Sequence, residues 1–172
     1  MVHCATPAGN VLFTGDYSVQ AQRTVPALTR PTVHADMVVS ESTYGQRLHE
    51  DRTSAENRLV AQVNAVLLRG GSVLIPAFAI GRAEEVILIL KKALRSHTLP
   101  EVPVFVDGMV RQACNVYGSY PGYMTRALAH ESVKTGHPFY TNGIIPVESA
   151  AARHEILRKG PCVIVASSGM LS

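Results

Sequence analysis

The sequence has few cysteines, no tryptophan and no long apolar run, and these absences exclude several classes of protein. Its three cysteines, Cys4, Cys114 and Cys162, lie far apart, which argues against a disulfide scaffold and excludes a four-cysteine zinc site. No stretch reaches the roughly 18 apolar residues of a membrane span, and the N-terminus lacks the features of a signal peptide. We therefore expect a soluble, cytoplasmic protein without a membrane partner.

The charge balance does not select a partner. The net charge is +3 with histidines counted as neutral, and the basic residues are scattered, with no run of five or more. Such a balance is compatible with a polyanionic partner and is equally typical of solvated surface. The 172 residues, of which 47% are hydrophobic, predict one domain, or one domain plus a fragment, with a core of its own.

Apolar runs and helical patterns alternate along the chain. Continuous apolar runs predict strands over 11–13, 37–40, 73–79, 102–106 and 162–166. Apolar residues at helical spacing predict helices over 54–69, 81–97, 109–117, 123–133 and 148–158. Ser54 is the expected N-cap of the first helix, and Pro76 is expected to bend or bulge its strand. This alternation predicts an α/β fold with a mainly parallel sheet flanked by helices.

Four predicted strands end in polar or small residues: Asp16, Glu41, Asp107 and the turn 167–169. In parallel sheets, ligands bind at the carboxyl ends of the strands, so these positions are candidates for a functional site. Turn chemistry is the simpler explanation at each position, because Asp, Ser and Gly also serve the turns that follow strands. Asp107 is the weakest of these candidates.

A series of short motifs gives a more specific indication. In order along the chain these are Phe13–Ser18, Glu41–Gly45, the run from Gly70 to Ala83 with its Gly-Arg-Ala helix start, and Ser167–Leu171. Together they resemble the metallo-β-lactamase/β-CASP nucleases, which act on RNA. The resemblance implies a Rossmann-like β-CASP domain over 36–172 and a short remnant of a metallo-β-lactamase domain over 1–35.

The resemblance also implies roles for the two acidic residues. Asp16 matches a zinc-bridging aspartate, and Glu41 matches the acid that orients a catalytic histidine. The alternative for Glu41 is a carboxylate bonded to local backbone. The family's His-x-His-x-Asp-His string is absent, so the two zinc ions of the intact protein are not expected to bind this chain alone. We therefore expect the chain to be inactive by itself.

Six further residues are candidates for contacting RNA: Arg82, His49, Arg52, Ser167, Ser168 and Gly169. Arg82 opens a predicted helix, where free N–H groups favour an anion such as the RNA phosphate, or it pairs with Glu85 or another carboxylate. The Ser-Ser-Gly turn either binds an anion or only connects a strand to a helix. His49 and Arg52 either line a nucleic-acid channel or belong to a solvated loop.

The leading hypothesis is that the chain is part of a zinc-dependent nuclease that hydrolyses phosphodiester bonds in single-stranded RNA. By resemblance, its role is mRNA 3′-end processing or similar to that of ribonuclease J. The alternative is a non-catalytic β-CASP paralogue that binds RNA or acts as a scaffold. An unrelated nucleotide-binding domain is disfavoured, because neither G-x-x-x-x-G-K-[ST] nor G-x-G-x-x-G occurs. Exposed apolar patches leave a homodimer open.

Overall fold

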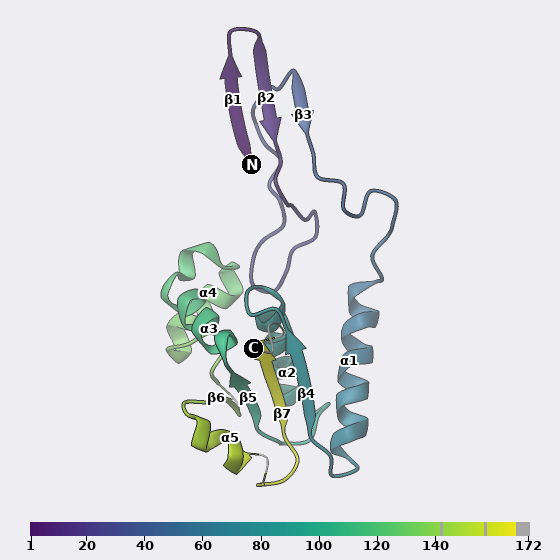
Figure 1. The fold of residues 1–172 in the computed structure, drawn as a ribbon, viewed down its shortest axis with the longest axis vertical. Helices are drawn as coiled ribbons and strands as arrows, with labels where there is room; N and C mark the ends of the chain where they lie inside the picture. Colours follow the sequence, from purple (N-terminus) through teal and green to yellow (C-terminus); the bar gives the residue numbers. More distant parts are fainter. Residues whose placement is uncertain (142, 157, 168–172) are drawn as a thin grey trace. The chain divides into compact units, whose positions relative to one another are not determined.

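The computed structural model describes residues 1–141, 143–156 and 158–167, and the chain forms two compact units (Figure 1). Unit 1 comprises Met1–Gln22 and Pro26–Glu50. Unit 2 comprises Arg23–Val25 and Asp51–Ser172. Each unit has its own sheet, so the two are described separately.

Unit 1 is built on a three-stranded sheet in the order β1-β2-β3. β1 (Val2–Thr6) and β2 (Gly9–Phe13) form an antiparallel hairpin, and β3 (Met37–Val39) pairs in parallel with β2. The predicted strands over 11–13 and 37–40 are confirmed. β1 was missed because its five residues are mostly exposed and contain no continuous apolar run.

Unit 2 contains a four-stranded, fully parallel sheet in the order β4-β7-β5-β6. Its strands are β4 (Val73–Ala77), β5 (Val104–Asp107), β6 (Ile144–Pro146) and β7 (Val163–Ser167). The predicted parallel sheet is confirmed. β6 was missed because its three residues lie in a segment whose glycines and prolines indicate a loop.

The expectation that Pro76 bends or bulges its strand is wrong. β4 pairs with β7 in unbroken register, with Leu74 opposite Ile164, Ile75 opposite Val165 and Pro76 opposite Ala166. β4 is an edge strand, and an edge position tolerates proline because one side of the strand needs no ladder hydrogen bond. The strand ends at Ala77, two residues before the end predicted for it.

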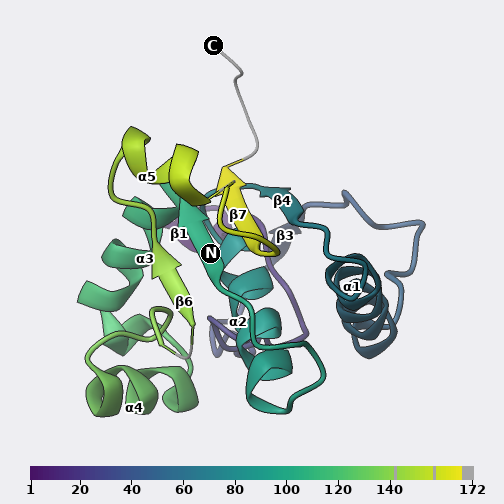
Figure 2. The same cartoon turned by 90° about the horizontal axis from the view of Figure 1, so that it is seen from below.

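The helices of unit 2 are α1 (Arg52–Leu67), α2 (Arg82–Arg95), α3 (Met109–Ser119), the short 3₁₀ helix η1 (Pro121–Tyr123), α4 (Arg126–Thr135) and α5 (Ala150–Ile156). The predicted helices are confirmed, with α4 beginning three residues later than expected. Both α2 and α3 contact β7, while α5 lies across the sheet from them (Figure 2). α1 contacts α2 and the edge strand β4.

The two sheet faces are covered unequally. Alternate residues of the central strands, such as Val104, Val106 and Val163, are fully buried in one core with α2 and α3. The opposite face carries Phe105 and Ile164, which pack in a smaller cluster with α5. The helix stripe predicted for 81–97 is confirmed, because Ala83, Ile87 and Leu90 are fully buried. The main core of unit 2 therefore lies between the sheet and the α2–α3 layer.

The predicted N-cap of α1 is wrong by three residues. Asp51 is the N-cap, and its Oδ2 accepts a hydrogen bond from the backbone N–H of Ser54 (2.8 Å). This hydrogen bond holds the pKa of Asp51 below its ordinary value. Ser54 resembles an N-cap in sequence, but Asp51 allows the helix to begin at Arg52 and satisfies one of its free N–H groups.

A three-residue segment of unit 2, Arg23–Val25, is held by side chains of α1, α2 and the residue before α4. The Glu85 carboxylate accepts hydrogen bonds from the backbone N–H groups of Arg23 (3.0 Å) and Thr24 (2.8 Å) and from the Thr24 hydroxyl (2.7 Å). Arg23 also pairs with Glu56 of α1, and the N–H of Thr125 donates to the Thr24 carbonyl (2.9 Å). Thr24 is buried as a result.

Candidate metal and RNA site

The two acidic candidates of unit 1 follow neighbouring parallel strands at the same edge of the sheet. β2 ends at Phe13, which pairs with Val39 at the end of β3. The backbone N–H of Thr14 then donates to the Val39 carbonyl (3.0 Å). The hydroxyl of Thr14 accepts from the N–H of Glu41 (3.3 Å). Thr14 is buried, so it links the segment leading to Asp16 with the one that carries Glu41.

The two carboxylates differ in their surroundings. Asp16 is exposed, and within the described ranges its carboxylate makes no hydrogen bond or ion pair. Glu41 is half-buried, and its Oε2 accepts a hydrogen bond from the backbone N–H of Thr43 (2.8 Å). This is the local role that the sequence left open for Glu41. Asp16 has both oxygens available for a cation.

The described residues do not assemble a complete zinc site. Among residues 1–141, 143–156 and 158–167, no three His, Cys, Asp or Glu side chains gather closely enough to hold a metal ion. A protein zinc site uses about three or four such ligands. Asp16 therefore offers one ligand, and no catalytic step through a metal follows from this chain alone.

In unit 2, Ser167 lies at the carboxyl end of β7, opposite Ala77 of β4. Its hydroxyl oxygen approaches the turn between β5 and α3, because a Cβ built on Gly108 would lie 3.0 Å from that oxygen. Gly108 also has a φ of 65°, so the turn requires glycine on both counts. Two other residues predicted to bind substrate, Ser168 and Gly169, lie outside the described residues.

Arg82 is the first residue of α2 and follows Gly81, whose φ is 84°. The sequence left open a pairing between Arg82 and Glu85. Glu85 instead binds Arg23 and Thr24 through both of its oxygens. In the described part of the chain Arg82 forms no ion pair, so its guanidinium remains available to an anion near the helix N-terminus.

His49 and Arg52 fall in different units. His49 belongs to unit 1, is exposed, and its ring centroid lies 4.0 Å from that of Tyr44. Arg52 is the exposed first residue of α1 in unit 2. Both positions are accessible to solvent, which is compatible with either alternative stated for them.

Asp107 has a structural role. Its carboxylate accepts hydrogen bonds from Nε (2.7 Å) and Nη2 (3.0 Å) of Arg153 on α5 and from the N–H of Gly108 (2.7 Å). Burial alone would raise the pKa of Asp107, but these bonds outweigh it and hold the pKa below its ordinary value. The residue links α5 to the turn after β5, which agrees with its low ranking as a candidate.

Sequence reasoning missed a buried polar cluster between α2, α3 and the loop before β6. Glu84 and Cys114 are fully buried, and the thiol of Cys114 donates to Glu84 Oε1 (3.8 Å). Burial raises the pKa of Glu84 to about 7. The Tyr140 hydroxyl donates to the carbonyl of Arg111 (3.2 Å), and burial raises its pKa as well. The sequence did contain a signal for the burial of Glu84. It lies next to Ala83 and three residues before Ile87, both of which belong to the predicted buried stripe of the helix.

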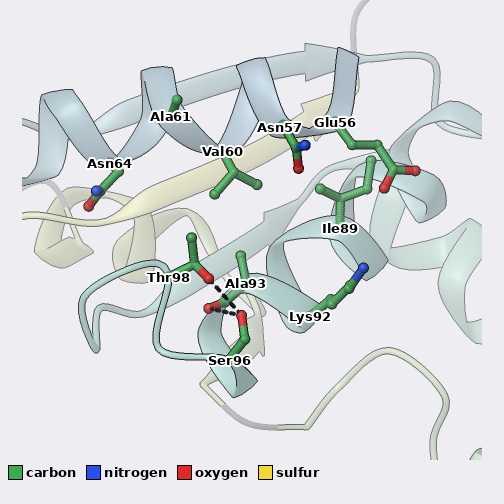
Figure 3. A pocket seen from close by; sticks show the side chains of 10 residues that line it. All are labelled: Glu56, Asn57, Val60, Ala61, Asn64, Ile89, Lys92, Ala93, Ser96 and Thr98. Atoms are coloured by element: carbon green, nitrogen blue, oxygen red, sulfur yellow. Dashed lines mark hydrogen bonds between the residues drawn. The ribbon is translucent and has the colours of Figure 1, made fainter. Parts of the chain in front are cut away.

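A groove of about 350 Å³ lies between α1 and α2 (Figure 3). Its walls combine apolar side chains, such as Val60 and Ile89, with the amides of Asn57 and Asn64 and the amine of Lys92. None of the residues predicted as site residues lines it. The groove is therefore separate from the strand-end positions described above.

The four-stranded parallel sheet with its flanking helices defines unit 2 as an α/β domain of Rossmann-like architecture. The chain belongs to the Beta-Casp domain family, whose model matches residues 83–172. This match confirms the family predicted from the sequence motifs.

Curated relatives match almost the whole chain. It is 36% identical over 174 residues to transcription termination factor FttA of Methanosarcina mazei, covering 99% of this chain and 27% of that protein. It is 35% identical over 174 residues to the same factor of Pyrococcus horikoshii, with the same two coverages. It is 35% identical over 163 residues to cleavage and polyadenylation specificity factor 73 of Drosophila melanogaster, covering 94% of this chain and 23% of that protein. The chain thus spans about a quarter of the length of these relatives.

Among the described residues, no helix is both long and apolar enough to cross a bilayer.

Proposed function

We propose that this chain is part of a larger zinc-dependent nuclease that hydrolyses phosphodiester bonds in RNA. The observation that carries the proposal is the placement of Asp16 and Glu41 after neighbouring parallel strands, linked through Thr14. Relatives named for transcription termination and for cleavage and polyadenylation support RNA as the substrate and 3′-end formation as the process.

Within this proposal the two carboxylates have different tasks. Asp16 supplies one metal ligand, since its exposed carboxylate has both oxygens available. Glu41 acts as a positioning residue, because its own backbone contacts fix it beside Thr14 while one carboxylate oxygen holds Thr43. The remaining ligands come from other parts of the larger protein. Zinc at such a site would activate water and offset charge on the phosphate.

We further propose that residues 1–35 belong to a metallo-β-lactamase domain and 36–172 to the β-CASP domain. The compact units divide differently, because β3 pairs with β2 and so places residues 37–39 in unit 1. In the β-CASP part, Arg82 and Ser167 contact the RNA backbone, with His49, Arg52, Ser168 and Gly169 as further contacts. A cytoplasmic location and a homodimer belong to the same proposal.

The test uses the full-length protein with Asp16→Asn, Glu41→Gln and, as a matched control, Glu155→Gln. Glu155 is 69% exposed on α5, and among the described residues its side chain pairs with Lys159 across one turn, so its loss should leave activity unchanged. We expect Asp16→Asn to lower the zinc content of the protein. It should also lower the rate at which a labelled single-stranded RNA is cleaved by at least about a hundredfold. Glu41→Gln should lower cleavage while most of the zinc is retained.

The second candidate function is the alternative stated from the sequence, a non-catalytic β-CASP paralogue that binds RNA or acts as a scaffold. Elemental analysis of the full-length protein separates the two functions. Two equivalents of zinc together with cleavage support the nuclease, whereas RNA binding without zinc or cleavage supports the paralogue.

A further inference from the structure

One side of α4 carries a row of exposed basic or imidazole side chains. Arg126, His130 and Lys134 are all exposed and follow one another at intervals of four residues. Residues at this spacing lie on one side of a helix. Leu128 and Ser132, which point the other way, are buried. The three side chains form a row roughly 12 Å long, given a rise of about 1.5 Å per residue.

Within the described residues, no ion pair neutralises the two permanent cations of this row. Between Met109 and Thr141 the sequence contains a single acidic residue, Glu131. Glu131 is already engaged, because Lys91 lies 3.1 Å from its Oε1 and Arg95 pairs with the same atom. These bonds and charges hold the pKa of Glu131 below its ordinary value, although burial alone would raise it. In the part of the chain that the structure describes, neither Arg126 nor Lys134 forms an ion pair.

Two aromatic side chains precede the row. Tyr120 precedes η1 and Tyr123 is its last residue, three residues before α4 begins. Their rings form an edge-to-face pair with centroids 6.5 Å apart. Tyr120 is 60% exposed and Tyr123 is 81% exposed. Neither ring therefore serves mainly to fill the core. α4 lies on the same side of the sheet as α2 and α3 (Figure 2).

We propose that these five residues, Tyr120, Tyr123, Arg126, His130 and Lys134, form a surface that binds single-stranded RNA. We call it the α4 surface. The α4 surface is distinct from the strand-end positions described above. The choice of RNA as its ligand rests on the proposed function. Exposed aromatic rings beside a row of cations are the combination that binds unpaired bases and their phosphates.

The exposed tyrosine rings favour single-stranded RNA over two other anionic ligands, an acidic peptide and duplex RNA. An acidic peptide would use the cations but has no need of two tyrosine rings. Duplex RNA is recognised through its backbone and 2′-hydroxyls, with its bases already stacked. Single-stranded RNA uses both features, since every base has a face that stacks on an aromatic ring.

The test measures binding of a labelled 12-nucleotide oligouridine to the full-length protein by fluorescence anisotropy. All variants carry Asp16→Asn, which prevents cleavage during the measurement. We expect Arg126→Gln with Lys134→Gln to weaken binding about tenfold and to reduce the salt dependence of log K by about 1.4, or 0.7 for each lost phosphate contact. Tyr120→Leu with Tyr123→Leu should weaken binding about tenfold with the salt dependence unchanged.

The matched control removes the same charge elsewhere. Arg158→Gln with Lys159→Gln changes two exposed residues after α5 and should alter affinity less than twofold. Thermal unfolding of every variant should match the parent, because all the changed side chains are exposed or half-exposed. Wild-type affinity in either α4 variant overturns the proposal. Binding of labelled polyglutamate is measured in the same way. If Arg126→Gln with Lys134→Gln weakens binding of both polyglutamate and RNA, and Tyr120→Leu with Tyr123→Leu weakens neither, the ligand is an acidic partner and not RNA.

The outcome is separable from that of the proposed function. If the full-length protein cleaves RNA but the α4 variants bind it normally, the α4 surface is wrong and the nuclease stands. If cleavage and zinc are absent but the α4 variants lose RNA binding, the nuclease is wrong and the α4 surface stands.

Discussion

The two units bury their apolar residues to very different extents. Within the described part of unit 1, Leu12 is the only apolar side chain that is buried, and β3 exposes Met37, Val38 and Val39 by 46–60%. In unit 2, a continuous core joins α1, α2, α3, α4 and the parallel sheet. Backbone pairing therefore holds the strands of unit 1 together, while side-chain burial stabilises unit 2.

The difference indicates where stability resides. A sheet with one buried apolar residue gains little from the hydrophobic effect, so unit 1 should open locally at a low free-energy cost. Three adjacent exposed apolar residues on β3 also form the kind of surface that other protein normally covers. Both points agree with the proposal that the chain is part of a larger protein, with residues 1–35 of unit 1 belonging to its metallo-β-lactamase domain.

The largest expected effect comes from Leu90→Ala, in the core of unit 2. Leu90 is fully buried on α2, so its truncation leaves a cavity and should lower the free energy of unfolding by about 2–5 kcal/mol. Urea unfolding measures the change, and hydrogen exchange assigns it to a unit. The matched Leu12→Ala should affect amide protection only in unit 1. Equal loss of protection in both units after Leu90→Ala would show that they unfold together and would break the comparison.

An intermediate effect is expected from the buried carboxyl group of unit 2. Burial raises the pKa of Glu84 from 4.5 to about 7, although backbone N–H groups pull it down. The folded state therefore binds this proton more tightly than the unfolded state, so stability falls as pH rises from about 4.5 to 7. Glu84→Gln removes the titration. The stability of the wild type relative to this variant should fall by about 3 kcal/mol across that range.

The measurement is a pH series of urea unfolding for both proteins. Asp107, Glu131 and His137 also have shifted pKa values, but they titrate alike in the two proteins and cancel in the difference. The groups that face Glu84 are Glu85, Cys114, Tyr117 and Tyr140. A difference that does not change between pH 4.5 and 7.5 would show that Glu84 is hydrated and that unit 2 is less tightly packed than its core indicates.

The smallest effect is expected on β3. Val38 is 56% exposed, and threonine keeps its β-branched shape, so Val38→Thr should change the free energy of unfolding by about 0.5 kcal/mol or less. Hydrogen exchange of β2 and β3 amides measures it. The matched change Val106→Thr, at a fully buried position of β5, should cost about 1–3 kcal/mol. A comparable cost at both positions would mean that β3 is covered in solution.

Prediction from the sequence succeeded where a local pattern was sufficient. The buried stripe of α2 repeats at helical spacing, and the strands of the central sheet are continuous apolar runs. Prediction from the sequence failed where the outcome depends on the position of a strand within the sheet. Pro76 is tolerated because β4 lies at an edge, and β6 is too short and too rich in turn residues to be recognised. Ser54 was predicted as the N-cap because serine is common there, but the hydrogen bond from its backbone N–H shows that Asp51 has this role.

The sequence by itself determined the alternation of strands and helices, the parallel sheet and the family, because these depend on periodicity and on the order of short motifs. The tertiary structure decided which polar residues are engaged. Asp107 forms an ion pair with Arg153, which lies 46 residues away in the sequence. Glu85 accepts hydrogen bonds from Thr24 and does not pair with Arg82. Asp16 and Glu41 follow neighbouring strands at one edge of a sheet. Such contacts depend on which helices and strands lie next to one another in the fold, and a local sequence pattern does not specify these neighbours.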